Sequence, residues 1–340
     1  MKNKVIVFLL CGMLALAHLT GCGINGSTIL MGRLADTEVF RIGDNICTLP
    51  EVKVYLTTAQ KQYENILGVD MWERDFGGIT LESYLKENIL GQIAQIKSMT
   101  LLAEEYKITL NEEEEKKVKE AAKTYFLSLN EKEKEYLGID EETIATLYRE
   151  YALANKVYEE ITKNVDTEVS DDEARKITVQ QIFFGFEEEE PRKQKSEQYK
   201  KAAEALKELR ETDSDFREVA EKYNQDENME YTFGKGEKEE SVEIAAFNLE
   251  IGQMSDVIET STGYVIMKCI SNFDREETDA NKAVIVEKRK TEAFDAVYDE
   301  FVGRQASQFN DELWEEITFS NDVEITNMTF FEVYDEIFGE

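Results

Sequence analysis

The spacing of apolar residues predicts a series of long helices in the first half of the chain. Between Thr80 and Tyr106, apolar residues recur three or four positions apart, which places them on one face of a helix. The segment after Asn111 carries glutamates in its first turn, the charge order that a helix dipole favours, and Asp140 opens a further helical pattern. We therefore expect residues 41–174 to form an all-helical module.

The pattern changes near Ser170. The run ITVQQIFFGF at residues 177–186 is rich in β-branched and aromatic residues, and GYVIMKCI at residues 263–270 has the same character. Between them lie two helical patterns, a FGKGE turn and the short helical segment VEIAAFNL. This order of elements predicts a compact α+β domain over residues 175–273.

The last part of the chain, residues 274–340, is expected to complete the helical module. Its apolar stripe predicts one long amphipathic helix, which cannot bury that stripe alone and should fold back onto the first helices. The stripe consists of Phe294, Val297, Phe301, Phe309, Leu313 and Ile317. The predicted fold class is α+β: a discontinuous all-helical module with a small α+β domain inserted into it.

The N-terminus has the pattern of a secretory signal. Lysines precede an uncharged apolar run at residues 5–17, which is too short to span a bilayer as a mature helix. The run ends in LTGC, which resembles the bacterial lipobox and implies cleavage before Cys22 with lipid attached to that residue. Residues 1–21 are then the signal and residues 22–40 a tether at the outer face of the cell membrane. An ordinary secretory signal or an uncleaved anchor is the alternative.

The net charge and the single histidine argue against several classes of ligand and of catalytic site. The formal net charge of −33 argues against nucleic-acid binding and against docking on an anionic lipid surface. The one histidine, His18, lies in the predicted signal, so the mature chain has no imidazole for a catalytic triad or an HExxH zinc site. The acidic runs at residues 112–115 and 187–190 lack the spacing of a calcium loop, and we expect no metal and no cofactor. Cys47 and Cys269 either pair or form two separate buried thiols.

Three blocks of the middle domain carry a family resemblance. DSDFREVAEKYNQD, FGKGE and AAFNLEIGQMSDVIETSTGYVIMK resemble, in order and spacing, the successive blocks of a parvulin-type peptidyl-prolyl isomerase. Together with the lipobox and the helical flanks, they make the chain similar to the PrsA/SurA family of extracytoplasmic foldases. The likeness covers residues 177–271 in sequence and the flanks only in architecture.

The resemblance implies a non-covalent reaction, in which hydrogen-bonding groups and an apolar cradle help the imide bond before a proline to twist. The family's two histidine positions align with Gln181 and Val265. Its acidic or thiol position aligns with Asp226, and its hydroxyl positions align with Thr260 and Thr262. Each of these residues also has an ordinary structural interpretation: Gln181 and Val265 as strand residues, Asp226 as a cap, and the threonines as turn residues.

The apolar residues that hold the proline ring in the family are replaced as well. Their positions align with Glu230, Lys238 and Val242 and, with Val265, would form the peptide-binding surface. The loose alignment through ENMEYTF leaves the position of Glu230 open by one or two residues. Charged side chains make a poor cradle for a proline ring, because binding would have to desolvate them.

These features predict a membrane-anchored extracytoplasmic foldase that shelters unfolded or partly folded exported polypeptides. The helical module would provide an apolar groove, and the parvulin-like domain would be a prolyl isomerase with weak or absent activity. One alternative is an isomerase that stays active through Gln181, Asp226 and Thr262. The other is a lipoprotein adaptor for one defined partner. The sequence does not decide between a monomer and a homodimer.

Overall fold

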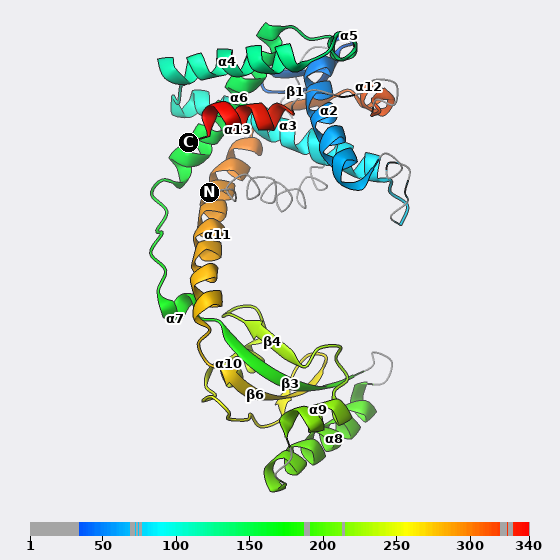
Figure 1. The fold of residues 1–340 in the computed structure, drawn as a ribbon, viewed down its shortest axis with the longest axis vertical. Coiled ribbons are helices and arrows are strands. Elements are labelled where there is room, and N and C mark those ends of the chain that lie inside the picture. Colours follow the sequence, from blue (N-terminus) through cyan, green and yellow to red (C-terminus); the bar gives the residue numbers. More distant parts are fainter. Residues whose placement is uncertain are drawn as a thin grey trace. The chain divides into compact units, whose positions relative to one another are not determined.

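The chain forms two compact units (Figure 1). In the computed structural model, the described residues are 34–68, 72, 74, 77–186, 191–212, 215–319, 325 and 329–339. The helical unit comprises Met1–Lys163 and Ala293–Glu340, and the sheet unit comprises Asn164–Glu292. The predicted signal, Cys22 and the acidic run at residues 187–190 lie outside the described residues.

The helical unit consists mainly of helices, of which α3, α4 and α6 start where the sequence predicts them. Its helices are α2 (Leu49–Leu67), α3 (Leu81–Tyr106), α4 (Glu112–Ser128), α5 (Glu131–Leu137), α6 (Glu141–Thr162), the end of α11 (Arg275–Val302), α12 (Asp311–Glu316) and α13 (Phe330–Phe338). The side chains of Thr80, Asn111 and Asp140 accept backbone hydrogen bonds at the N-termini of α3, α4 and α6. These bonds satisfy amides that have no partner within the helix.

The helical unit contains a small sheet, which contradicts predictions made from the sequence. Strands β1 (Glu38–Ile42), β2 (Asn45–Thr48) and β7 (Ser307–Phe309) pair antiparallel in the order β2-β1-β7. The module is therefore not entirely helical, and β1 begins inside the predicted tether. The prediction of one long C-terminal helix is wrong: α11 ends at Val302, and Phe309 lies in β7 opposite Phe40. Pairing with β1 satisfies the backbone of this segment in a way that its apolar spacing does not indicate.

One hydrophobic core holds the two segments of the helical unit together. It combines residues of α2, α4 and α6 with residues from beyond Ala293. Buried aromatic side chains from both segments are Tyr55, Tyr125, Tyr148, Phe294, Phe301, Trp314 and Phe330. The predicted fold-back of residues 274–340 onto the first helices is therefore confirmed for its part from Phe294 onward, and with it the discontinuous α+β architecture.

A buried charge cluster links three helices in this core. The ammonium group of Lys97 in α3 lies 2.8 Å from a carboxylate oxygen of Glu51 in α2 and 2.8 Å from one of Glu150 in α6. All three residues are buried. Burial raises the pKa of Glu150, whereas for Lys97 the two carboxylates outweigh burial and raise the pKa.

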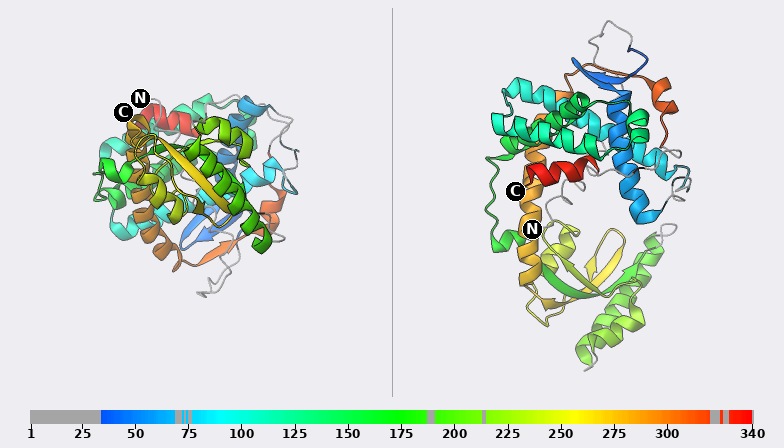
Figure 2. Two further views of the ribbon diagram at one scale, coloured as in Figure 1. Left: turned by 90° about the horizontal axis from the view of Figure 1, so that it is seen from below. Right: turned by 45° about the horizontal axis from the view of Figure 1, so that its top comes forward.

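The sheet unit is an antiparallel sheet with helices on both faces. Its strands β3 (Ile177–Gly185), β4 (Glu230–Phe233), β5 (Ile258–Glu259) and β6 (Gly263–Ser271) follow the order β4-β3-β6-β5. Helices α8 (Pro191–Glu211) and α9 (Phe216–Tyr223) pack on the face that carries Ile182, Phe184 and Ile266 (Figure 2). Helix α10 (Glu240–Phe247) packs on the face that carries Val179, Val265 and Met267.

The sheet unit is longer than the predicted domain, residues 175–273, because the preceding segment is attached to α11. Arg289 donates hydrogen bonds to the carbonyl oxygens of Asp166, at 2.9 Å, and Glu168, at 3.0 Å. It also donates to a carboxylate oxygen of Glu173, in the short helix α7 (Asp171–Ala174), at 2.7 Å. The segment 164–174 and the first part of α11 therefore belong to the same unit as the sheet.

The two cysteines within the described residues are both free. Cys47 lies in β2 and Cys269 in β6, and both thiols are buried. Burial raises the pKa of both thiols. None of the described helices is both long enough and apolar enough to span a membrane.

Candidate functional site

The candidate site lies on the α10 face of the sheet. Alternate residues of a strand point to the same face, so Gln181 and Phe183 share the face of Val179. Met267 lies opposite Gln181 on β6, and Val265 lies opposite Phe183. Gln181 is thus the polar member of an otherwise apolar row on β3.

A hydrogen-bonded trio forms at this position. The side-chain amide of Gln181 donates to Oδ2 of Asp226 at 2.9 Å, and the hydroxyl of Tyr231 donates to the same oxygen at 2.7 Å. The loop after α9 places Asp226: the side-chain amide of Asn224 donates to the Asp226 carbonyl at 2.9 Å. The structure therefore joins the two predicted residues Gln181 and Asp226 by a direct hydrogen bond and adds Tyr231 as a second donor to Asp226.

Tyr231 remains a neutral hydrogen-bond donor at physiological pH. Burial raises its pKa above the usual value of 10.0, and the hydrogen bond and negative charge of Asp226 raise it further. Lys238 lies with its ammonium group 4.6 Å from the centre of the Tyr231 ring and 5.6 Å from that of Phe233. This cation–π contact places Lys238 beside the trio.

The structure places Glu230 away from this group. In the register of β3 and β4, Glu230 pairs with Gln180 and points to the opposite face of the sheet, whereas Tyr231 pairs with Val179. The amide of Gln180 donates to Glu230 at 3.4 Å. Tyr231, one residue further along, is the residue of β4 that lies on the face of Gln181, within the one or two residues that the alignment of ENMEYTF left open.

Val242 and Val265 belong to the core beneath the site. Their exposed fractions are 7% and 5%, and both pack in the cluster that contains Phe233 and Met267. Both side chains pack in the core under the site, so they expose almost no surface to a ligand.

The two threonines shape the turn into β6. The Thr260 hydroxyl bonds with both the backbone amide and the carbonyl oxygen of Gly263, each at 3.0 Å, and the Thr262 carbonyl accepts from the amide of Phe186 at 2.8 Å. Gly263 cannot carry a side chain here, because its Cβ would lie 2.3 Å from the carbonyl oxygen of Phe184. These contacts account for Thr260 as a turn residue, and the Thr262 side chain is exposed without belonging to the trio.

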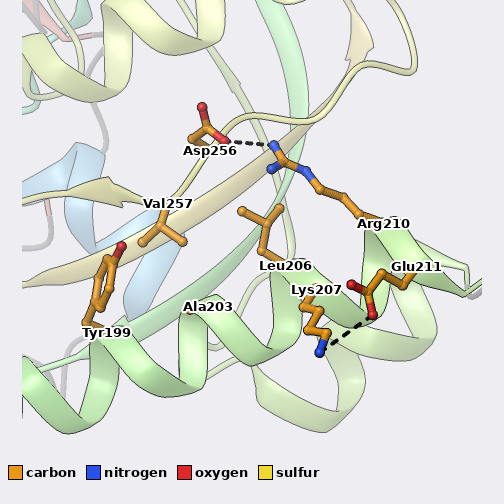
Figure 3. Close-up of a pocket in the computed structure, with 8 residues that line it drawn as sticks. All are labelled: Tyr199, Ala203, Leu206, Lys207, Arg210, Glu211, Asp256 and Val257. Atoms are coloured by element: carbon orange, nitrogen blue, oxygen red, sulfur yellow. Dashed lines mark hydrogen bonds and ion pairs between the residues drawn. The ribbon is translucent and has the colours of Figure 1, made fainter.

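A concavity lies elsewhere on the sheet unit. It has a volume of about 400 Å³ and lies between α8 and the segment before β5 (Figure 3). An ion pair of 2.8 Å between Arg210 and Asp256 closes one side, and Tyr199 stands at the other. It contains none of the predicted site residues. Within the described part of the chain, no group of three His, Cys, Asp or Glu side chains could hold a metal ion.

The trio can support non-covalent chemistry. It combines two donor groups, an amide and a phenol, with a carboxylate that accepts from both. Bond rotation at proline needs no proton transfer, so the absence of histidine does not by itself exclude it. However, Asp226 already accepts the hydroxyl hydrogen of Tyr231 and one of the two N–H groups of the Gln181 amide.

Comparison with known proteins identifies the sheet unit. Residues 182–271 match the family model of the rotamase, PPIC-type PPIASE domain, which confirms the parvulin-type assignment of this segment. The chain is 28% identical over 244 residues to "Foldase protein PrsA" of Caldanaerobacter subterraneus, a match that covers 68% of this chain and 73% of that protein.

The chain is also similar to solved structures, at lower sequence identity. The peptidylprolyl isomerase PrsA of Bacillus cereus is 17% identical, with a TM-score of 0.37, covering 86% of this chain and 95% of that one. PrsA of Bacillus anthracis is 20% identical, with a TM-score of 0.33, covering 69% of this chain and 100% of that one.

Proposed function

We propose that this chain, whose residues 182–271 form a parvulin-type domain, is an extracytoplasmic foldase that acts chiefly as a chaperone for exported polypeptides. The curated relative named as a foldase supports this proposal, as does the signal-like N-terminus with its lipobox resemblance. Cys22 would carry the lipid that holds the protein at the outer face of the membrane.

The prolyl isomerase activity of the domain is weak or absent in this proposal. The observation that carries it is the single carboxylate oxygen of Asp226, which accepts from both Gln181 and Tyr231. To use the Tyr231 hydroxyl or the bonded N–H of the Gln181 amide, a prolyl peptide would have to break a hydrogen bond to a charged acceptor, each worth about 1.5–3 kcal/mol. The charged Lys238 beside the aromatic rings adds a desolvation cost.

A refolding assay tests both parts of the proposal. We expect the chain without residues 1–21 to reduce aggregation of a denatured secretory protein and to leave the slow, proline-limited phase of its refolding unchanged. An accelerated slow phase would contradict the weak-isomerase assignment, and failure to reduce aggregation of any exported polypeptide tested would contradict the chaperone assignment.

Two matched variants locate any isomerase activity that is found. Gln181→Ala removes one member of the trio, whereas Gln180→Ala changes the neighbouring glutamine on the opposite face of the sheet. If the trio catalyses isomerisation, only Gln181→Ala reduces the rate of the slow phase.

Lipid attachment is tested separately. We expect the wild-type chain to partition with membranes and to incorporate radiolabelled fatty acid, and Cys22→Ser to lose both properties. Fatty-acid labelling of Cys22→Ser at the wild-type level would contradict attachment at this residue.

A further inference from the structure

Helix α13 sits in a groove of the helical unit with its aromatic face buried. Phe330 and Val333 are fully buried, and Tyr334 is partly buried. Phe330, Tyr334 and Phe338 follow at intervals of four, so they lie on one face of the helix. The acidic residues Glu332 and Glu336 lie on the exposed side.

Aromatic rings from other helices form the walls of this groove. The Phe330 ring stacks on Tyr148 of α6, with ring centres 4.1 Å apart and an interplanar angle of 6°. Tyr55 of α2 lies 5.3 Å from Phe330, and Tyr151 of α6 meets Tyr334 edge-on at 4.6 Å. Tyrosine-rich surfaces are typical of binding sites, because a rigid ring offers a large contact area at a low cost in conformational entropy.

Few polar contacts hold α13 in place. The Phe330 amide donates to Thr58 at 3.2 Å, the Tyr148 hydroxyl donates to the Phe330 carbonyl at 3.0 Å, and Asn155 donates to the Tyr334 hydroxyl at 3.1 Å. Among the described residues, no ion pair connects α13 to the rest of the unit. The groove should therefore recognise a helix by the spacing of its aromatic rings. The charge on the exposed side of that helix should have little effect on binding.

The helix itself depends on the groove. It has nine residues, and isolated helices shorter than about 12–15 residues are marginal in water. A capping box between Thr329 and Glu332 satisfies backbone amides at its N-terminus. A segment with these properties folds when it binds and unfolds when it leaves, as a disordered ligand does.

We propose that the groove formed by α2, α4 and α6 is a binding site for short amphipathic helices with aromatic residues four positions apart, and that α13 is its resident occupant. Release of α13 opens the groove, and a segment of an unfolded polypeptide with the same pattern takes its place. The inference rests on the proposed function only in naming exported polypeptides as the source of such segments.

A binding experiment in trans tests the site. A fluorescent peptide with the sequence of residues 329–339 is titrated, with anisotropy as the readout, into the full mature chain and into a chain that ends at residue 328. We expect saturable binding to the truncated chain and about tenfold or more weaker binding to the full chain, because α13 occupies the groove there. In the peptide, Phe330→Ala should abolish saturable binding, and the matched exposed change Glu336→Ala should leave the affinity unchanged.

The remaining outcomes oppose the proposal. A truncated chain that is folded by circular dichroism but does not bind the peptide overturns it. A truncated chain that is unfolded and is not restored by the peptide shows that α13 is an integral core element, and also overturns it.

Hydrogen exchange on the full chain provides a test that needs no truncation. We expect the amides of α13 to exchange faster than those of α6, and excess peptide to accelerate exchange in α13 only. Exchange of α13 solely through global unfolding, together with α6, would contradict a releasable occupant. Neither experiment measures aggregation or proline isomerisation, so their failure is distinct from failure of the proposed function.

Discussion

Asp226 determines the chemistry of the candidate site at the scale of single residues. One of its carboxylate oxygens accepts hydrogen bonds from the Gln181 amide and the Tyr231 hydroxyl, so both groups are drawn to Asp226. The polar side chains on this face thus bond to one another, which is the usual condition for polar groups on a partly buried surface.

The first prediction concerns the pKa of Tyr231. Asp226→Asn should lower it, because after burial the hydrogen bond and the charge of Asp226 are what raise it. A spectrophotometric titration of each form, corrected with the matching Tyr231→Phe variant, measures the change. The stabilisation that Asp226 provides is fully present below the unfolded pKa of Tyr231 and is lost as pH rises through the folded pKa. An unchanged Tyr231 pKa in Asp226→Asn would refute the hydrogen-bonded trio.

At the scale of elements, a few contacts decide how helices and segments attach to one another. Lys97 connects α2, α3 and α6 from within the core, and Arg289 attaches the segment 164–174 to α11 at the surface. The two differ in burial, so the same kind of charged contact should have different consequences for stability.

The second prediction is that Lys97→Met strongly destabilises the helical unit. It leaves the buried carboxylates of Glu51 and Glu150 without a counter-charge, a change that typically costs about 3–5 kcal/mol. Lys156→Met is the matched control, because its pair with Glu114 is partly exposed and should be worth no more than about 1 kcal/mol. Urea unfolding measures both variants.

The pH dependence of Lys97→Met provides a check on the cause. The loss of stability should shrink as pH falls, because burial raises the pKa of Glu150, which can then take up a proton and become neutral. Equal losses at neutral and acidic pH would show that the destabilisation comes from packing and not from charge.

The third prediction concerns the segment held by Arg289. Arg289→Ala should increase hydrogen exchange in residues 164–170 while leaving the sheet unit folded, because the guanidinium donates to two backbone carbonyls of that segment. Lys288→Ala is the control, since its side chain is exposed and its ion pair with Glu292 stays within the helix. Similar exchange in both variants would contradict the attachment.

At the scale of the whole molecule, the two units differ in whether one continuous segment of the chain or two separate segments form them. The sheet unit is continuous from Asn164 to Glu292, whereas the helical unit needs residues from both ends of the described chain. Its core includes Phe294, Phe301 and Trp314, which follow the sheet unit in sequence.

The fourth prediction is that a chain ending at residue 292 keeps a folded sheet unit but loses the helical unit. Removing the buried rings of Phe294, Phe301, Trp314 and Phe330 costs more than a typical domain stability of about 5–15 kcal/mol, since each such loss costs about 3–5 kcal/mol. Limited proteolysis and calorimetry measure the outcome, and the full chain is the control. A helical unit that stays resistant to protease without residues 293–340 would contradict the discontinuous core.

The sequence by itself determined the elements that depend on local interactions. Thr80, Asn111 and Asp140 mark helix starts because a side chain caps amides only a few residues away. The parvulin-type assignment also followed from short blocks of residues in order and spacing, and the same resemblance named Gln181 and Asp226, which the structure joins by a hydrogen bond.

Contacts between segments that are far apart in sequence could be seen only in the tertiary structure. The strand β7 forms because β1, far away in sequence, offers unpaired backbone groups, and this overrides the helical spacing around Phe309. The register of β4 put Tyr231 rather than Glu230 on the site, since a shift of one residue reverses the face of a strand. The groove that holds α13 is likewise formed by aromatic rings from three helices. No local sequence pattern specifies that these rings lie next to one another.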